Sequence, residues 1–405
     1  MNILYINHYA GSISMGMEFR PYYFAREWQK MGHKVRIIGA SYSHLRKENP
    51  KVEKDFEIQM IDGVEYQWIK TGTYNGNGVA RAMTMFEFCS KLWLNAKRIV
   101  KEFQPDVVIA SSTYPLDTYP IRRISKRAKA KYIHEVHDMW PATLYEVGGL
   151  SKYSPFVVLM QMAENYAYRN CNELVALMPY SKEYMVEHGL QAEKFHNIQN
   201  GIQEEEWDSN VIIPKEHQAF FDEHDNQFIV GYFGGHALSN ALDNLLDAAK
   251  ANTDKDVIFV LVGSGVEKQR LMKRQKTESI NNVYFLDAVE KKAVPDLLKN
   301  YDCSIMTGIP SPLYRFGLCL NKMYDSMMAG KPIICAITAP KTMVEEYKCG
   351  IQVNDVDTEH INKAISDMKS LSNKEREEMG GNGKRAVLEK FTYSVLARMF
   401  ERLMH

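Results

Sequence analysis

Residues 321–336, NKMYDSMMAGKPIICA, hold the most informative pattern of the chain. One acid, Asp325, stands near the start of a helical segment, and Gly330 follows where such a helix would end. Glycine commonly ends helices, and the apolar run 333–336 behind it is typical of a buried strand. A helix that leads directly into a buried strand is the repeating unit of doubly wound α/β domains, which bind ligands in loops at the carboxyl ends of their strands.

The rest of the chain follows the same pattern. In the first half, short apolar runs predict strands at residues 3–6, 35–39, 106–110, 131–136 and 173–177, and helical periodicity begins near residues 20, 81, 117, 155 and 181. In the second half, strands are predicted at residues 228–233, 257–262, 283–286, 303–306 and 332–336. Strands that alternate with helices predict parallel sheets covered on both faces.

The length of 405 residues favours two domains over one. A turn at Asn200-Gly201 and the polar stretch after it mark the boundary. We therefore predict an α/β protein with two Rossmann-like, doubly wound domains that face a cleft. They span residues 1–202 and 203–385, and a C-terminal helix over residues 386–405 packs back towards the first domain.

Composition excludes several classes of protein. Fifty basic and fifty acidic residues cancel, so no overall charge attracts nucleic acid. The six cysteines lack zinc-site spacing, which favours free thiols in a reducing compartment. Residues 1–8 resemble a first strand more than a signal peptide, and no apolar stretch approaches the ~20 residues of a membrane span. We expect a cytoplasmic protein.

Two glycine-rich turns follow predicted strands of the second domain. Gly234 and Gly235 come after the first of these strands, with Ser239 as the expected N-cap of the next helix, and Gly263 comes after the second. Such turns let the backbone approach a phosphate closely, although a tight turn alone would also need small residues. Neither the dinucleotide fingerprint nor a P-loop is present. Asp325 has two interpretations: a ribose-binding carboxylate beside these turns, or an acid that only stabilises the helix dipole.

At this point a family resemblance can be named. Residues 325–332 resemble the E-A-M-A-x-G-x-P segment of retaining group 1 glycosyltransferases (glycosyltransferase family 4, GT-B fold). Further segments are similar to other family motifs in the same order, at residues 18–38, 200–202, 259–265, 282–289 and 301–306. The resemblance implies a nucleotide-sugar donor in the second domain, with Val289 in the loop that frames the base, and an acceptor-binding first domain.

The chain departs from the family in two places. Gly317 stands where the family has the first of two glutamates, and no lysine or arginine lies between Gly231 and Ala249 to clamp the donor diphosphate. Asn321-Lys322 is similar to the P-N-K-x-x-D/E variant of bacterial surface-polysaccharide enzymes that resemble N-acetylfucosaminyl transferases. The cations that could replace the clamp are, in order of preference, Lys322 first and then Arg315, Lys291 and Arg20.

The segment 133–141 of the first domain, IHEVHDMWP, holds the candidate acceptor residues. It resembles an E-x-x-D-x-W-P loop that lines the acceptor side. We predict that Asp138 and His137 orient the acceptor, with Glu135 as the alternative, although polar caps around a Trp-Pro turn would explain the same residues. Neighbours on a strand point to opposite sides, so we expect no metal site here.

Arg20 follows a loop that contains Gly16 and opens the first long helix. It is either a phosphate- or acceptor-binding group in the cleft or an ordinary arginine on the helix surface. Family membership implies retention of anomeric configuration by front-face attack, with no protein nucleophile, metal or cofactor. Charge stabilisation on the leaving diphosphate and alignment of the acceptor would then supply the catalysis.

The basic segment 121–131 could bind the enzyme to the anionic inner face of the cytoplasmic membrane. The expected acceptor there is a glycan or a polyprenyl-linked molecule. A solvated helix face is the alternative, and the apolar run 155–160 is a weaker second candidate. The leading function is a retaining hexosyl- or N-acetylhexosaminyltransferase with a nucleotide-sugar donor, with UDP as the expected nucleotide, in capsule, O-antigen or related synthesis. Two alternatives remain open: a UDP-sugar 2-epimerase of the same architecture, and a catalytically silent partner subunit that binds nucleotide sugar.

Overall fold

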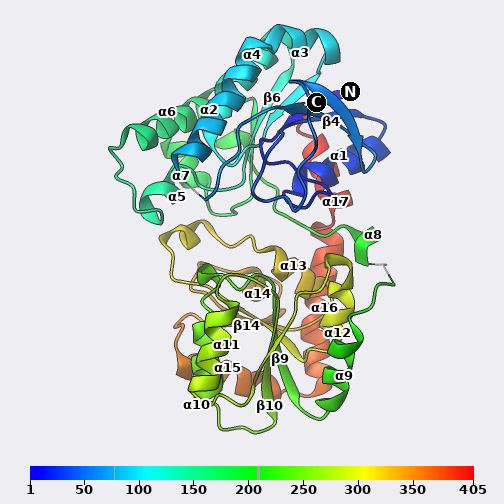
Figure 1. The fold of residues 1–405 in the computed structure, drawn as a ribbon, viewed down its shortest axis with the longest axis vertical. Coiled ribbons are helices and arrows are strands. Elements are labelled where there is room, and N and C mark those ends of the chain that lie inside the picture. Colours follow the sequence, from blue (N-terminus) through cyan, green and yellow to red (C-terminus); the bar gives the residue numbers. More distant parts are fainter. Residues whose placement is uncertain (77, 208–209) are drawn as a thin grey trace. The chain divides into compact units, whose positions relative to one another are not determined.

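The computed structural model describes residues 1–76, 78–207 and 210–405 and divides the chain into two compact units (Figure 1). Unit 1 comprises Met1–Gln199 and Tyr393–His405, and unit 2 comprises Asn200–Thr392. The chain therefore passes between the units twice, at residues 199–200 and 392–393. None of the described helices is both long enough and apolar enough to span a bilayer.

Unit 1 is built on an eight-stranded sheet with the order β3-β4-β2-β1-β5-β6-β7-β8. The strands are β1 (Asn2–Ile6), β2 (Lys34–Ala40), β3 (Glu57–Ile61), β4 (Val64–Ile69), β5 (Val107–Ala110), β6 (Lys131–Val136), β7 (Glu173–Ala176) and β8 (Phe195–Asn197). All neighbours are parallel except β3 and β4. The helices are α1 (Arg20–Lys30), α2 (Val79–Leu94), α3 (Ala96–Phe103), α4 (Thr118–Ala128), α5 (Ala142–Glu146), α6 (Pro155–Asn170), α7 (Lys182–Glu187) and α17 (Tyr393–Glu401).

Unit 2 has a six-stranded parallel sheet with the order β11-β10-β9-β12-β13-β14. Its strands are β9 (Phe228–Phe233), β10 (Val257–Val262), β11 (Val283–Leu286), β12 (Cys303–Thr307), β13 (Ile333–Ala336) and β14 (Gly350–Gln352). Its helices are α8 (Glu204–Trp207), α9 (Lys215–Glu223), α10 (Asp243–Ala251), α11 (Lys268–Thr277), α12 (Val294–Lys299), α13 (Asn321–Met328), α14 (Met343–Glu346), α15 (Thr358–Ser370) and α16 (Asn373–Lys390).

Burial explains why the parallel strands could be recognised from apolar runs. Every residue of β9, β10, β12 and β13 is buried, because helices cover both faces of the sheet. The strand order reverses direction at β1/β5 in unit 1 and at β9/β12 in unit 2. Ligands of doubly wound sheets bind at the carboxyl ends of the strands beside such a reversal. The fold thus directs attention to the loops after β5, β6, β9 and β12.

The C-terminal helix α17 packs on α1 within unit 1. Phe24 and Trp28 of α1 are stacked with ring centroids 5.1 Å apart, and Phe400 of α17 meets both rings edge-on. The Trp28 indole N–H donates to the carbonyl of Ala397 at 3.2 Å. The last residues of the chain therefore complete the apolar core that the first strands begin.

The hairpin of β3 and β4 was missed by the sequence analysis. Its turn is Asp62-Gly63, and both residues have positive φ, at 48° and 80°. Asp-Gly between alternating strands is a strong hairpin signal, so the sequence did contain the information. The strands β8 and β14 were also missed, because each has three half-buried residues and no apolar run.

Candidate functional site

The two glycine-rich turns of unit 2 pack backbone against backbone at the carboxyl ends of β9 and β10. A Cβ on Gly263 would lie 1.9 Å from the carbonyl oxygen of Gly234, and Gly234 itself has a φ of +126°. The N–H of Gly234 donates to the carbonyl of Val262. Close packing therefore explains the glycines at 234 and 263, whereas Gly235 is exposed and its N–H has no acceptor among the described residues. That N–H is available to an anion.

Ser239 is not the N-cap that the sequence predicted. It lies in a short 3₁₀ turn, Leu238–Asn240, and α10 begins only at Asp243, with Leu242 at the N-cap position. Ala241 between them adopts the left-handed conformation with a φ of 45°, which interrupts the helix. The prediction failed because a left-handed residue separates the turn from the helix.

Lys322, in the first turn of α13, points to the turn after β9. Its Nζ donates to the Tyr232 hydroxyl and to Oδ1 of Asn240, both at 3.1 Å, and lies 4.4 Å from the centre of the Tyr232 ring. Burial lowers the pKa of this amine to about 8. No described carboxylate pairs with it. The structure thus holds a largely buried cation without a protein counter-ion beside a loop that suits phosphate.

Asp325 lies one turn after Lys322 on the same helix. Its carboxylate is half-buried and accepts no hydrogen bond from a described residue. Burial raises its pKa to about 6, although the nearby Lys291 ammonium acts in the opposite direction. A carboxylate with open acceptor positions is suited to the hydroxyls of a ribose. Asn321 precedes this pair, is exposed, and accepts from the Asn200 amide at 2.9 Å.

The other cations proposed for the diphosphate have protein partners. Lys291 pairs with Glu206 at 3.0 Å, and Arg315 donates to the carbonyl of Pro312 at 2.7 Å. Val289 is half-buried and packs with the apolar cluster beside β11. Gly317 ends the 3₁₀ turn Pro312–Phe316 with a φ of +94°. Of the predicted donor residues, the structure brings Lys322 to the turn of Gly234 and Gly235, against which Gly263 packs. Asn321 and Asp325 lie on the same helix as Lys322.

His236 was missed by the sequence analysis. It is fully buried between the two glycine-rich turns, and neither ring nitrogen has a hydrogen-bond partner within the described chain. Burial, together with Lys268 and Lys322, lowers its pKa to about 4. The ring therefore stays neutral at physiological pH, and the positive charge beside it comes from Lys322 and from Lys268, which pairs with Asp287 at 2.7 Å.

The predicted acceptor residues of unit 1 divide into a buried and an accessible part. Glu135 lies on β6, and its side chain is completely buried in an ion pair with Arg20. His137 follows the strand with 10% of its side chain exposed, and Asp138 after it is exposed. A backbone bend at residues 137–138 turns the chain out of the sheet, which explains the difference in exposure.

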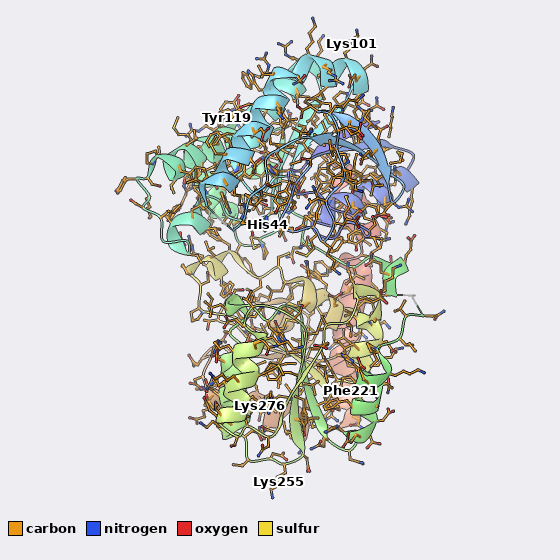
Figure 2. The ribbon with its side chains drawn as sticks, in the orientation of Figure 1. His44, Lys101, Tyr119, Phe221, Lys255 and Lys276 are labelled. Carbon is orange, nitrogen blue, oxygen red and sulfur yellow. The ribbon has the colours of Figure 1, made fainter. Side chains whose placement is uncertain are left out.

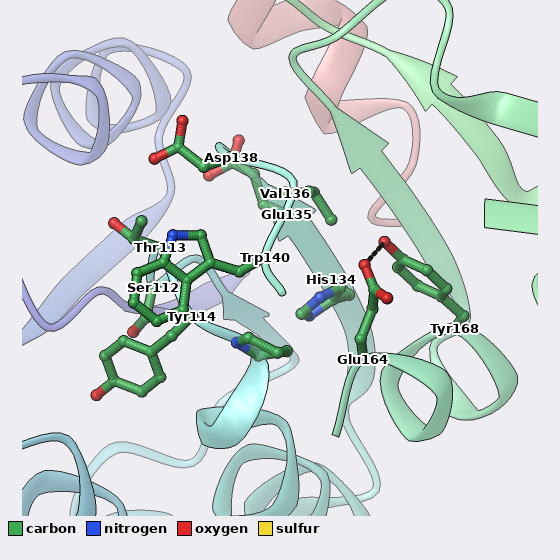
Figure 3. Close-up of a pocket in the computed structure, with 11 residues that line it drawn as sticks. Ser112, Thr113, Tyr114, His134, Glu135, Val136, Asp138, Trp140, Glu164 and Tyr168 are labelled. Atoms are coloured by element: carbon green, nitrogen blue, oxygen red, sulfur yellow. Dashed lines mark hydrogen bonds between the residues drawn. The ribbon is translucent and has the colours of Figure 1, made fainter. Parts of the chain in front are cut away.

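Figure 3 shows a small cavity beside these residues at the ends of β5 and β6. Its lining includes Tyr114, His134, Asp138, Trp140 and Glu164. Glu164 of α6 was not predicted from the sequence; burial raises the pKa of its carboxyl to about 7, and it accepts from the Tyr168 hydroxyl at 2.8 Å. No sequence signal marked this glutamate, because it lies on a helix far from β6 in the chain.

Arg20 and Gly16 have structural roles in the described conformation. The Arg20 guanidinium is fully buried against Glu135 at 2.9 Å, so the interpretation as an arginine on the helix surface is wrong. Gly16 exchanges backbone hydrogen bonds with Ser12 and has a φ of +101°. A Cβ there would lie 3.0 Å from the N–H of Lys47, so the turn itself requires glycine.

Two family models match the chain, one in each half. Glycosyltransferase Family 4 matches residues 15–206, and Glycosyl transferases group 1 matches residues 215–386. A protein of Pseudomonas aeruginosa named "Probable glycosyltransferase WbjE" is 24% identical over 265 residues, which are 64% of this chain and 63% of that protein. The matches to curated relatives span between 20% and 63% of the relatives' own length.

Solved structures share the fold over almost the whole chain. HepE from Anabaena, in complex with UDP and glucose, has a TM-score of 0.66 at 14% identity and covers 99% of this chain and 98% of that chain. WaaG, a glycosyltransferase involved in lipopolysaccharide biosynthesis, has a TM-score of 0.65 at 14% identity, with 99% of each chain covered. Because the family models match both halves and the two-unit fold is that of these structures, the chain belongs to the group 1 glycosyltransferases of GT-B fold.

Proposed function

We propose that the protein is a retaining glycosyltransferase that moves a hexose or N-acetylhexosamine from a UDP-linked donor to a glycan or polyprenyl-linked acceptor of a bacterial surface polysaccharide. The observation that carries the proposal is the buried Lys322 without a protein counter-ion, one helical turn before the open carboxylate of Asp325. A diphosphate would neutralise the first group, and a ribose would fill the acceptor positions of the second.

The related proteins support the choice of donor. HepE was solved with UDP and glucose, and its fold is that of this chain. The resemblance of Asn321-Lys322 to the variant in surface-polysaccharide enzymes supports the class of product. His137 and Asp138, accessible at the end of β6, are the proposed acceptor-side groups. We also propose that the reaction uses no metal or cofactor, and that the protein works in the cytoplasm.

The donor assignment is tested by ligand binding to the full chain. A thermal-shift screen against UDP-, GDP- and dTDP-sugars should give the largest stabilisation with UDP-sugars, by about 2.7 kcal/mol at a hundred times Kd. Calorimetry with UDP and 2′-deoxy-UDP then tests Asp325: the wild type should prefer UDP, and Asp325→Asn should lose most of that preference. Equal binding of both ligands by the wild type would contradict the ribose role.

Turnover separates the proposed reaction from the alternatives. Sugar transfer to lipid-linked or glycan acceptors, unchanged by EDTA, is the expected result. Release of free epimerised sugar without an acceptor would identify an epimerase instead. Tight UDP-sugar binding without turnover on a broad acceptor panel would identify a silent partner subunit.

We further propose that unit 1 attaches peripherally to anionic membrane. α2 packs on α4, and its exposed face is apolar, with Val79 79%, Met83 62% and Leu94 78% exposed. Lys126 and Arg127 of α4, which packs on both α2 and α3, are exposed, as is Lys101 of α3, which Figure 2 shows pointing outward. Apolar side chains flanked by basic ones fit the interface of an anionic bilayer.

Sedimentation with liposomes tests this attachment. The wild type should bind vesicles rich in phosphatidylglycerol at low salt and release them as salt rises. Lys126→Glu with Arg127→Glu should weaken binding by about tenfold or more, because each basic residue near the surface contributes about 1 kcal/mol. The control is the same double charge reversal on α11, at Lys273 and Lys276. Equal binding by both double variants would contradict the proposal.

A further inference from the structure

A buried polar network connects the end of β6 with Ile198 and Gln199, where the chain first leaves unit 1. The Arg20 guanidinium contacts Oε1 of Glu135 through Nε at 3.0 Å and Nη2 at 2.9 Å. It also donates to the carbonyls of Ile198, at 2.8 Å, and Gln199, at 2.6 Å. Both side chains of the ion pair are 0% exposed. One arginine thus fixes Glu135 and the residues that precede the first passage of the chain between the units.

The second carboxylate oxygen of Glu135 is shared by three groups. It accepts from the hydroxyls of Tyr5, at 2.5 Å, and Ser111, at 2.6 Å, and lies 3.1 Å from Nε2 of His137. The Ser111 oxygen also lies 2.8 Å from the same nitrogen. Because the Ser111 proton is donated to Glu135, both oxygens near Nε2 are acceptors. Nε2 of His137 therefore carries a proton.

His137 is the member of this network that reaches the surface. Its side chain is 10% exposed, and no described residue bonds to Nδ1. When the imidazole is neutral, Nδ1 is an acceptor; when it is charged, Nδ1 becomes a donor that can meet an anionic oxygen. The protonation state of His137 therefore decides which kind of ligand atom it can bind.

We propose that Arg20 and Glu135 are positioning residues that keep His137 charged, with its Nδ1–H presented to a phosphate oxygen of the substrate. The proposal rests on the proposed function for the identity of the substrate. The charged state of His137, by contrast, is a property of the ligand-free protein. The phosphate belongs either to the leaving diphosphate of the donor or to a lipid-linked acceptor.

The charges around His137 favour this state. Burial and, to a smaller extent, the Arg20 charge lower the pKa of the imidazole, but the hydrogen bond and charge of Glu135, with the charge of Glu18, outweigh them and raise the pKa above its usual value. Arg20 therefore favours the charged form of His137 only through Glu135, which it keeps ionised. Burial raises the pKa of Glu135, yet Arg20 and His137 bring it well below the usual range, so the carboxylate remains charged. The ionisable groups that interact with His137 are Glu18, Arg20, Asp117, His134, Glu135 and Asp138.

Histidine-selective ¹³C NMR of the ligand-free full chain tests whether Glu135 keeps His137 charged. His137→Gln identifies the signal. In the wild type, His137 should titrate above pH 6.5, and Glu135→Gln should lower its pKa by about 1 or more. Tyr5→Phe is the matched control, since it removes one partner of Glu135 but keeps the charge, and His137 should still titrate above 6.5.

A wild-type His137 that titrates at or below pH 6.5 would overturn the proposal, and this measurement needs no variant to fold. An unchanged pKa in Glu135→Gln would overturn it as well. UDP and farnesyl phosphate, each added at saturation, then distinguish the two sources of phosphate, because the true ligand shifts the His137 signal. If calorimetry shows that both ligands bind and neither shifts the His137 signal, His137 does not contact a substrate phosphate. Failure of UDP to bind contradicts the proposed donor and leaves the titration result intact.

Discussion

Lys322→Met should bind UDP-sugar about 100-fold more weakly than the wild type, while its affinity for uridine is unchanged. The amine lies beside the glycine-rich turn, where the resemblance places the diphosphate, whereas the Lys268 amine at the neighbouring turn pairs with Asp287 at 2.7 Å. Removing one partner of a buried, hydrogen-bonded charge pair typically costs about 2–5 kcal/mol of binding, which includes the 100-fold loss expected here. Because uridine lacks the diphosphate, it reports only on the base and ribose contacts.

The same substitution should stabilise the ligand-free protein. Keeping a buried ammonium without a counter-ion lowers its pKa from 10.5 to about 8, which corresponds to a cost on the order of 3 kcal/mol. The cost is present in full below pH 8, falls as pH rises from 8 to 10.5, and disappears only above 10.5, where the amine is neutral in both the folded and the unfolded chain. Lys322→Met should therefore melt at a higher temperature at pH 7 and lose most of this advantage by pH 10.5.

Two controls make the result specific. Lys331→Met removes a partly buried lysine just beyond the other end of α13, whose amine donates to the carbonyl of Lys299, and should leave donor binding unchanged. In the wild type, donor affinity should fall as pH rises through 8, since the free amine loses its proton. The affinity of Lys322→Met should not fall over this pH range. A Lys322→Met protein that binds UDP-sugar normally would contradict the proposal that Lys322 binds the donor diphosphate.

Arg20→Met should lower the free energy of unfolding of unit 1 by about 3–5 kcal/mol. The substitution leaves the Glu135 carboxylate buried without its counter-ion and removes the donor to two carbonyls. Breaking a buried ion pair from one side is strongly destabilising, because the remaining charge cannot return to water. The expected change is thus far larger than a surface arginine would give.

Urea unfolding followed by tryptophan fluorescence measures this effect. Four of the five tryptophans belong to unit 1, namely Trp28, Trp68, Trp93 and Trp140, so the signal reports mainly on that unit. Arg98→Met is the matched control: its pair with Glu102 is exposed and should be worth about 0–1 kcal/mol. If the two variants unfold at the same urea concentration, the ion pair of Arg20 contributes nothing to stability.

The buried parallel strands and the helix α13 could be predicted because their signals are local. Strands covered on both faces are continuous apolar runs, and the run 333–336 coincides with β13. Half-buried strands such as β8 give no such run. The positions of Lys322 and Asp325 on one helix also follow from the sequence, since residues three apart lie on the same side of a helix.

The partners of these residues are a property of the tertiary structure. Lys322 meets Tyr232, which is 90 residues away in the chain, and Arg20 meets Glu135, which is 115 residues away. A local pattern carries no information on such contacts, because they depend on which sheet edge each loop reaches. For the same reason Arg20, a candidate ligand by sequence, proved to be a buried partner of Glu135.

The sequence by itself determined the fold class, the family and the helix that carries Lys322 and Asp325, because apolar periodicity, turn residues and short motifs act over a few positions. Only the tertiary structure decided which charged groups are paired and which are open. Lys291 and Arg20 are neutralised by Glu206 and Glu135, whereas Lys322 meets only neutral groups. Burial and distance set the energy of a charge, and both exist only once the chain has folded.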